Sequence, residues 1–146
     1  MSLYTKTLVA IDPYIKSDDL IQKAIGITAD RNNITLIHVM ELLGALPTAP
    51  YAPVVLDTSQ VESQVKKSAI EHMKSLLDKH KLNDNGFLIL SGSTATEIKN
   101  YAAEHDYDAI VIGSHGRHGL SLLLGSTSSA VIHGCGCDVL VVRLKE

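Results

Sequence analysis

Five short, almost uninterrupted apolar runs are spread along the chain, and they predict five buried β-strands. The predicted strands are Thr7–Asp12, Ile34–Val39, Gly86–Gly92, Asp108–Gly113 and Asp138–Arg143. Runs of this length that lack polar alternation are typical of strands covered on both faces, as in a parallel sheet. The pattern therefore predicts a sheet with helices on both of its faces.

Amphipathic segments separate these runs and predict four helices, of which the longest covers Asp57–His80. Its apolar side chains recur at helical spacing and predict one buried face: Val61, Val65, Ala69, Met73, Leu76 and Leu77. Acidic residues after Ser17 predict where the first helix begins, and the Ser/Thr-x-x-Glu capping box at Thr94–Glu97 predicts the beginning of the third. The fourth helix is expected from about Gly125 to His133.

The alternation of strands and helices indicates a parallel sheet with right-handed crossover connections. We therefore expect a single α/β domain over residues 1–146, a doubly wound open five-stranded parallel sheet with the strand order 3-2-1-4-5. Ligands of such sheets bind outside the carboxyl ends of the strands, where the direction of winding reverses. In this order the reversal lies between strands one and four, which end at Asp12 and Gly113.

Composition narrows the classes of function. The chain is 45% apolar with a net charge of -3, which is typical of a globular domain without a broad basic surface, so no nucleic-acid partner is expected. We see neither a secretory signal pattern nor an apolar stretch of about 18 residues, and so expect a cytoplasmic protein without a membrane partner. Residues 41–56 hold three of the four prolines and predict an irregular connection, either a lid or partner surface or a plain surface loop.

The segment after the fourth predicted strand, GSHGRHGLSLLLGST at residues 113–127, combines glycines, hydroxyls and an arginine. Gly113, Gly116 and Gly119 allow backbone N–H groups to turn inward around an anion. Arg117 adds a positive charge, and Gly125-Ser126-Thr127 opens a helix whose first N–H groups favour a phosphate. These features indicate a nucleotide phosphate site, although their spacing matches neither the P-loop nor the Rossmann fingerprint.

The histidines of this region have two open interpretations. His115 and His118 either contact a phosphate or hydrogen-bond loop carbonyls, and neighbouring serines lack the third partner that a hydrolytic triad needs. His38 lies inside a predicted strand, where we expect a hydrogen-bonded core or edge residue rather than a ligand.

Only two cysteines occur, Cys135 and Cys137, just before the last predicted strand. Alternate residues that lead into a strand point apart, so we expect this pair to bridge poorly. Together with His133 they offer three metal ligands, but a zinc site needs a fourth. We therefore expect no metal site here, only small, half-buried side chains.

The whole chain resembles the universal stress protein family. The resemblance is carried by the segments LVAID, LIHV, YDAIVIGSHGRHG, LLGSTSSAVI and CDVLVVR, which follow one another in the family's order. Nucleotide-binding members share the pattern Gly-x2-Gly-x9-Gly-Ser/Thr, and its two halves match Gly113 to Gly116 and Gly125-Ser126. Between these halves the chain has eight residues, RHGLSLLL, where the family pattern has nine. The surrounding loop either absorbs the missing residue or turns the Gly125-Ser126 donors away from the phosphates.

The resemblance implies a site for an adenine nucleotide, ATP or AMP, with Mg²⁺ or Mn²⁺ present only together with a triphosphate. It implies that Asp12 lies near the ribose or a phosphate-bound metal and that the backbone of Val39 meets the edge of the adenine. The residues implied around the phosphates are Gly113, Ser114, His115, Gly116, Arg117, Gly125, Ser126 and Thr127.

Two functions follow from the resemblance. The first is a stress-response sensor or regulator that binds an adenine nucleotide and hydrolyses it slowly at most, because no positioned general base is evident. The second is a dimeric stress protein that binds no nucleotide and acts through protein-protein interaction, since LSGS at residues 90–93 and the ending VVRLKE are similar to a branch of the family unable to bind ATP. For either function, the resemblance implies a homodimer formed by antiparallel pairing of the Asp138–Arg143 strand with its copy.

Overall fold

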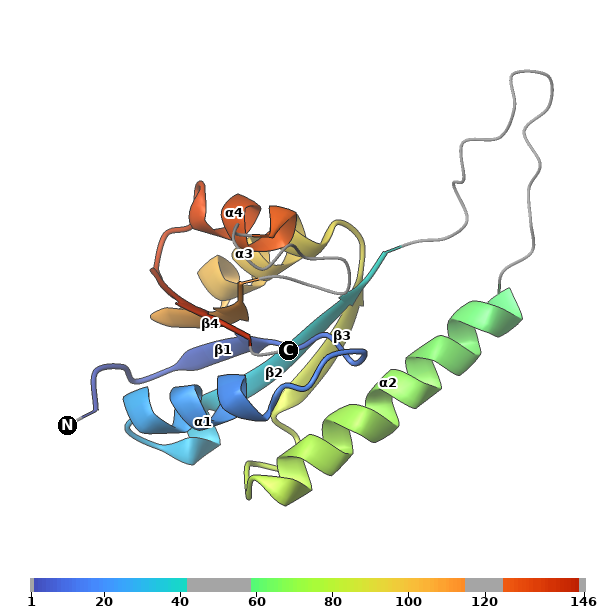
Figure 1. Cartoon of the computed structure of the whole chain (residues 1–146), viewed down its shortest axis with the longest axis horizontal. Helices are drawn as coiled ribbons and strands as arrows, with labels where there is room; N and C mark the ends of the chain where they lie inside the picture. The colour runs from blue at the N-terminus through green and yellow to red at the C-terminus, as the bar shows by residue number, and fades with distance from the viewer. Residues whose placement is uncertain (1, 42–58, 115–124, 145–146) are drawn as a thin grey trace.

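The computed structural model describes residues 2–41, 59–114 and 125–144. Within them, strands and helices alternate along the chain (Figure 1). The elements are β1 (Thr7–Ala10), α1 (Asp18–Ile27), η1 (Arg31–Asn33), β2 (Ile34–Met40), α2 (Ser59–Lys79), β3 (Phe87–Ser91), α3 (Thr94–Glu104), β4 (Ala109–Gly113), α4 (Ser126–Ile132) and β5 (Asp138–Val142). The five strands form one sheet in the order β3-β2-β1-β4-β5. Every pairing is parallel, which confirms the predicted topology.

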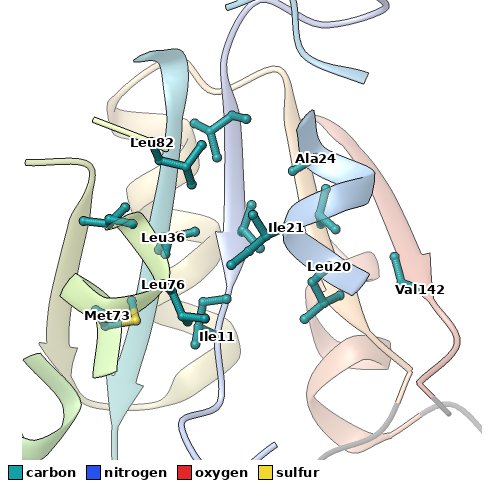
Figure 2. Packing of buried hydrophobic residues seen from close by; sticks show 13 residues of the cluster. Ile11, Leu20, Ile21, Ala24, Leu36, Met73, Leu76, Leu82 and Val142 are labelled. Carbon is teal, nitrogen blue, oxygen red and sulfur yellow. The ribbon is translucent and has the colours of Figure 1, made fainter. Parts of the chain in front are cut away.

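Helices cover both faces of the sheet, with α1 and α2 on one side and α3 and α4 on the other (Figure 1). Side chains of α1 and α2 meet those of the strands in the first of two cores, where Ile21, Leu36 and Met73 have no exposed surface (Figure 2). The second core lies beneath α3 and α4 and includes Ile37 and Ile110. Successive residues of β2 thus face opposite cores, as the two-residue period of a strand requires.

The central strands explain the uninterrupted apolar runs. Leu8 and Val9 in β1 and Ile110 and Val111 in β4 have no exposed surface, although neighbouring residues face opposite sides. A strand covered on both faces needs apolar residues at every position. The described residues contain no helix that combines the length and apolarity needed to cross a bilayer.

Two predictions about the helices are wrong. Val61 was expected on the buried face of α2 but is 53% exposed, because the first turns of this helix extend beyond the edge of the sheet (Figure 1). The capping box at Thr94–Glu97 does not form: the residue before α3 is Ser93, and Thr94 is already helical. The Thr94 hydroxyl instead donates to the carboxylate of Glu41, at 3.3 Å. The predicted irregular connection lies, from residue 42 onward, outside the described residues.

The expectation that Cys135 and Cys137 point apart is also wrong. Their Sγ atoms lie 3.5 Å from one another. Both residues precede β5, which begins at Asp138, and the chain bends between them instead of running as a strand. In a regular strand, residues two apart share a face but lie about 7 Å apart, so it is the bend that lets the two sulfurs meet.

A cluster of charged and polar groups fastens the beginning of α1 to the end of α2. Asp18 Oδ1 lies 2.8 Å from Lys79 Nζ and 2.8 Å from Nε2 of the buried His80. Hydrogen bonds from Lys79 and then His80 hold the pKa of Asp18 below its usual value. The other ring nitrogen of His80 lies 3.2 Å from Gln22 Nε2. This cluster joins the beginning of α1 to the end of α2.

Candidate functional site at the carboxyl edge of the sheet

The carboxyl ends of β1, β2 and β4 bring residues from three distant segments to one edge of the sheet. In the observed register Ala10 lies beside Ile37 of β2, and Val9 lies beside Val111 of β4. Continued past the end of β1, this register puts Asp12 level with Val39 on one side and with Ser114 on the other. The predicted reversal of winding thus coincides with the crevice where three of the predicted residues converge.

The hydrogen-bond ladder between β1 and β2 ends at a proline. The last bond runs from the Ile11 N–H to the Ile37 carbonyl, at 2.8 Å. Two residues further, Pro13 is in register to donate to the Val39 carbonyl, but proline has no N–H. In a parallel strand, residues two apart direct their backbone groups to the same neighbour. The N–H and C=O of Val39 therefore both point toward β1. The carbonyl finds no donor there, because the residue in register is Pro13, and the Val39 side chain is only 5% exposed.

Asp12 is held in place by its own turn. Its Oδ1 accepts a hydrogen bond from the Tyr14 N–H at 2.9 Å, and its carbonyl accepts one from the Ile15 N–H at 3.1 Å. This is the side-chain turn that aspartate commonly makes at the start of a loop. It fixes the half-buried carboxylate at the end of β1, beside the Val39 backbone.

The chain that leaves β4 is hydrogen-bonded to the chain that begins α4. The Ser114 N–H donates to the Val142 carbonyl of β5 at 2.9 Å, and its own carbonyl accepts from the Gly125 N–H at 2.5 Å. The hydroxyl of Ser128, which is 2% exposed, lies 3.3 Å from the Ser114 carbonyl and 3.0 Å from the Gly125 carbonyl. The ends of the two predicted half-motifs, Gly113-Ser114 and Gly125-Ser126, are therefore adjacent.

Gly113 has a packing role that its sequence context did not indicate. A Cβ atom at this position would lie 2.6 Å from Cδ1 of Leu144, which follows β5. Leu144 also packs against the core beneath α1 and α2. A side chain here would have to displace the end of the Leu144 side chain, so packing favours glycine at this position, whereas its predicted contact with a phosphate stays a prediction.

The remaining predicted phosphate contacts divide into two groups. Gly125 immediately precedes α4, and the first two helical residues are the exposed Ser126 and the half-buried Thr127. His115, Gly116 and Arg117 lie outside the described residues, as does the segment that is one residue shorter than the family pattern. The described residues thus bring together seven of the ten predicted site residues: Asp12, Val39, Gly113, Ser114, Gly125, Ser126 and Thr127.

A pocket of about 300 Å³ lies next to this crevice, on the face of the sheet that α2 covers. It is lined by Pro13, Tyr14, His38, Gln64, Val65, Ser68, Ala69 and His72. His38 Nδ1 lies 3.0 Å from the Ile11 carbonyl, which confirms the expected hydrogen-bonded histidine. His72 Nε2 is buried, and nothing in the described part of the chain hydrogen-bonds to it. Sequence reasoning missed His72, because a single polar residue next to a helix's apolar stripe carries no distinguishing signal.

Comparison with known proteins identifies the family. The sequence pattern of the Universal stress protein family matches residues 3–143. Universal stress protein A homolog 2 of Coxiella burnetii is 37% identical to this chain, over 99% of each. The chain belongs to the universal stress protein family. Within the family, universal stress protein UspA from Lactobacillus plantarum has the same fold, with a TM-score of 0.72 at 23% identity, over 98% of this chain and all of the other.

Two further family members of the same fold have been solved with nucleotides. One is a universal stress protein in complex with cAMP, with a TM-score of 0.58 at 20% identity, over 97% of this chain and 98% of the other. The second is the universal stress protein from Archaeoglobus fulgidus in complex with dAMP, with a TM-score of 0.56 at 22% identity, over 95% of this chain and 98% of the other. At these identities the similarity shows a common fold.

Proposed function

We propose that this universal stress protein binds an adenine nucleotide, ATP or AMP, in the crevice between β1, β2 and β4 and acts in the cytoplasm as a stress-response sensor or regulator. The observation that carries the proposal is the end of the β1–β2 ladder at Pro13. It leaves the Val39 C=O without a donor from β1 at the position that the register makes level with Asp12, and the Val39 N–H points the same way. The adenine nucleotides bound by two relatives of the same fold support this choice of ligand.

A backbone N–H and C=O that point the same way offer one donor and one acceptor side by side. The edge of adenine presents the complementary pair, because its exocyclic amine donates and the adjacent ring nitrogen accepts. Guanine reverses this pattern at the same edge, with a carbonyl that accepts and a ring N–H that donates. We therefore infer that Val39 selects adenine over guanine, since a mismatched polar edge loses its hydrogen bonds on burial.

The Asp12 carboxylate is proposed to accept hydrogen bonds from the ribose hydroxyls or to contact a metal that arrives with a triphosphate. Gly113, Ser114 and the beginning of α4 at Gly125-Ser126-Thr127 would surround the phosphates, with His115, Gly116 and Arg117 beside them. Backbone N–H groups at the start of a helix favour such anions. Mg²⁺ or Mn²⁺ would be bound only together with ATP.

Binding rather than turnover is proposed as the activity. Attack of water on a phosphate needs a group that orients the water, and among the described residues Asp12 is the carboxylate that the register brings to the crevice. A carboxylate engaged with ribose or metal does not serve that purpose. We expect ATP hydrolysis well below about one turnover per second.

Calorimetry tests the proposal on protein freed of nucleotide, with ATP, AMP and GTP, each with and without Mg²⁺. Heat and a thermal shift with ATP or AMP, and much less with GTP, are expected. Pro13→Ala is the sharpest variant, because the new N–H competes with adenine for the Val39 carbonyl. We expect it to weaken adenine binding about tenfold, the worth of one good hydrogen bond.

Gly136→Ala is the matched control, since a Cβ there meets no atom within 4 Å and the residue lies away from the crevice. This variant should bind as the wild type does. Absence of heat and of thermal shift at millimolar ATP and AMP would refute nucleotide binding. Equal affinities for ATP and GTP would refute the assigned role of Val39.

A second candidate function is that of a homodimer acting through protein-protein interaction without nucleotide. The observation in its favour is β5 (Asp138–Val142), an edge strand that pairs with β4 within the described residues. Because the Val142 carbonyl bonds to the Ser114 N–H beside β4, the backbone groups of Val139 and Val141 point outward. An uncovered edge of this kind favours pairing with another strand.

We propose that a second copy of β5 pairs there in antiparallel orientation, about a two-fold axis. Sedimentation at micromolar concentration should show a dimer. Val141→Pro, which removes one outward N–H but none of the bonds to β4, should shift it toward monomer. A monomeric wild type would exclude this candidate. A dimer that gives no heat with ATP or AMP would favour it over the nucleotide sensor.

A further inference from the structure

The two cysteines meet at the end of the sheet opposite to the nucleotide crevice. Cys135 and Cys137 flank Gly136 in the bend that joins α4 to the amino end of β5. Their Sγ atoms lie 3.5 Å apart, and both thiols are free and half-buried. Both pack against the core beneath α3 and α4. The bend therefore presents two thiols to each other at a partly accessible position.

The backbone of the bend has room to bring the two sulfurs together. A disulfide needs them at about 2.05 Å, so the gap must close by roughly 1.5 Å. Gly136 is exposed, and even an added Cβ there would meet no atom within 4 Å. Gly134, just before the pair, already has a φ of 81°, which residues with side chains seldom adopt. Small rotations about these glycines can close the ring without pushing against the neighbouring core.

The Cys137 thiol is held in its protonated form. Burial, together with the contact with Cys135, raises the pKa of Cys137 to about 12. Cys137 therefore keeps its proton at physiological pH and can offer it to the sulfur of Cys135. Because the thiolate is the reactive form, we assign the first attack to Cys135 and the resolving role to Cys137.

A metal site is a weaker reading of the same residues. The described residues contain no group of three or more histidine, cysteine, aspartate or glutamate side chains arranged to hold a metal ion. His133, the third potential ligand in the sequence, follows α4 and has its Nδ1 2.8 Å from the Ser129 carbonyl of that helix. Two sulfurs alone leave a zinc ion with half of its usual ligands.

We propose that Cys135 and Cys137 form a reversible redox site that reacts with hydroperoxides and closes to an intrachain disulfide. In the first step the Cys135 thiolate attacks the peroxide. The O–O bond breaks, an S–O bond forms, and the released alkoxide or hydroxide takes up a proton. Cys135 is then a sulfenic acid, and the peroxide has been reduced by two electrons.

In the second step the sulfur of Cys137 attacks the sulfur of Cys135. The S–S bond forms, the S–O bond breaks, and hydroxide leaves with the proton of Cys137 as water. In total the two thiols lose two electrons and two protons, and the peroxide becomes an alcohol, or water, and a second water. A small dithiol reverses the change by thiol-disulfide exchange.

The experiment treats the full-length, reduced protein with hydrogen peroxide and with tert-butyl hydroperoxide, blocks the remaining thiols with iodoacetamide, and measures the intact mass. The expected product is monomeric on a non-reducing gel, lighter than the reduced chain by two hydrogens, and unalkylated. Dithiothreitol should restore two alkylatable thiols. Two serine variants assign the roles, since Cys→Ser removes reactivity and changes the side-chain volume little.

Cys137→Ser should stop at the sulfenic acid on Cys135, which dimedone labels, whereas wild type should take up little dimedone. Cys135→Ser should retain an alkylatable thiol after the same exposure. Both variants should melt close to the reduced wild type, which separates loss of reactivity from loss of folding. Treated wild type that still carries two alkylatable thiols, or that is linked mainly between chains, would overturn the proposal. Equal dimedone labelling of wild type and Cys137→Ser would overturn the resolving role of Cys137.

Discussion

A buried pair of hydroxyls gives a prediction in which two similar substitutions differ in cost. Thr7 in β1 and Thr28 at the end of α1 are both buried, and their Oγ1 atoms lie 2.7 Å apart. Thr28 Oγ1 also lies 2.6 Å from the Ala24 carbonyl, which can only accept. The single proton of the Thr28 hydroxyl therefore goes to Ala24, and the Thr7 hydroxyl must donate to Thr28.

The direction of this hydrogen bond determines how much each substitution lowers the free energy of unfolding. Thr7→Val removes one hydrogen bond and leaves Thr28 still donating, so the free energy of unfolding should fall by about 1 kcal/mol. Thr28→Val removes both bonds and leaves the Thr7 hydroxyl buried without an acceptor, which should cost about 3 kcal/mol. Changing both to valine removes the two bonds but leaves no buried hydroxyl, so the double variant should lose only about 2 kcal/mol.

Urea unfolding followed by circular dichroism measures these free energies for the wild type, both single variants and the double variant. The distinctive expectation is that adding Thr7→Val to Thr28→Val restores about 1 kcal/mol. A double variant less stable than Thr28→Val alone would refute the assigned direction of the hydrogen bonds. So would a Thr7→Val variant that is less stable than Thr28→Val.

Three further predictions concern other contacts and turns of the fold. Ser128→Ala should lower the free energy of unfolding in urea by only about 1 kcal/mol, because the Ser114 and Gly125 carbonyls that its hydroxyl contacts each keep a backbone N–H donor. It should nevertheless weaken ATP binding in calorimetry, because it removes a link between the two half-motifs. Asp18→Asn should lower the free energy of unfolding at pH 7. Because the folded pKa of Asp18 is depressed, its contribution is present above the unfolded pKa of about 4 and is lost as pH falls through the folded pKa, so the two unfolding curves should converge in acid. Gly134→Ala should lower the melting temperature and cost about 1 kcal/mol because of its positive φ, whereas Gly136→Ala, with open space around it, should melt like the wild type.

The sequence predicts the layered sheet well because its signals are local. The fully apolar runs at Leu8–Val9 and Ile110–Val111 follow directly from cover on two faces, and alternation with helices leaves few topologies. The crevice follows from the strand order, so the convergence of Asp12, Gly113 and Ser114 was predictable. The exposure of the Val61 side chain was not predictable, because it depends on how far α2 extends past the sheet.

Other features depend on contacts between distant residues or on the course of a bend, which periodicity cannot reveal. The atom that would lie 2.6 Å from a Cβ at Gly113 is Cδ1 of Leu144, which comes 31 residues later in the chain. The meeting of Cys135 and Cys137 depends on where β5 begins, and a shift of that boundary by two residues would separate the sulfurs. Ser93 precedes α3 although Thr94 fits the capping-box pattern, since helix boundaries are the least certain part of any reading of sequence.

The end of β5 lies between the proposed nucleotide crevice and the proposed dimer edge. Val142 accepts the Ser114 N–H, and Leu144 fills the space left by the missing side chain of Gly113. A partner strand paired with the outer edge of β5 would therefore contact the strand whose end, Val142 and Leu144, packs against Gly113 and Ser114 at the crevice. Under the two proposals, these shared residues would link nucleotide binding to dimer formation, and a nucleotide that tightened the dimer would itself bind more tightly to the dimer, by the same factor. The last strand would then let the occupancy of the crevice set the oligomeric state, and the oligomeric state set the sensitivity of the crevice.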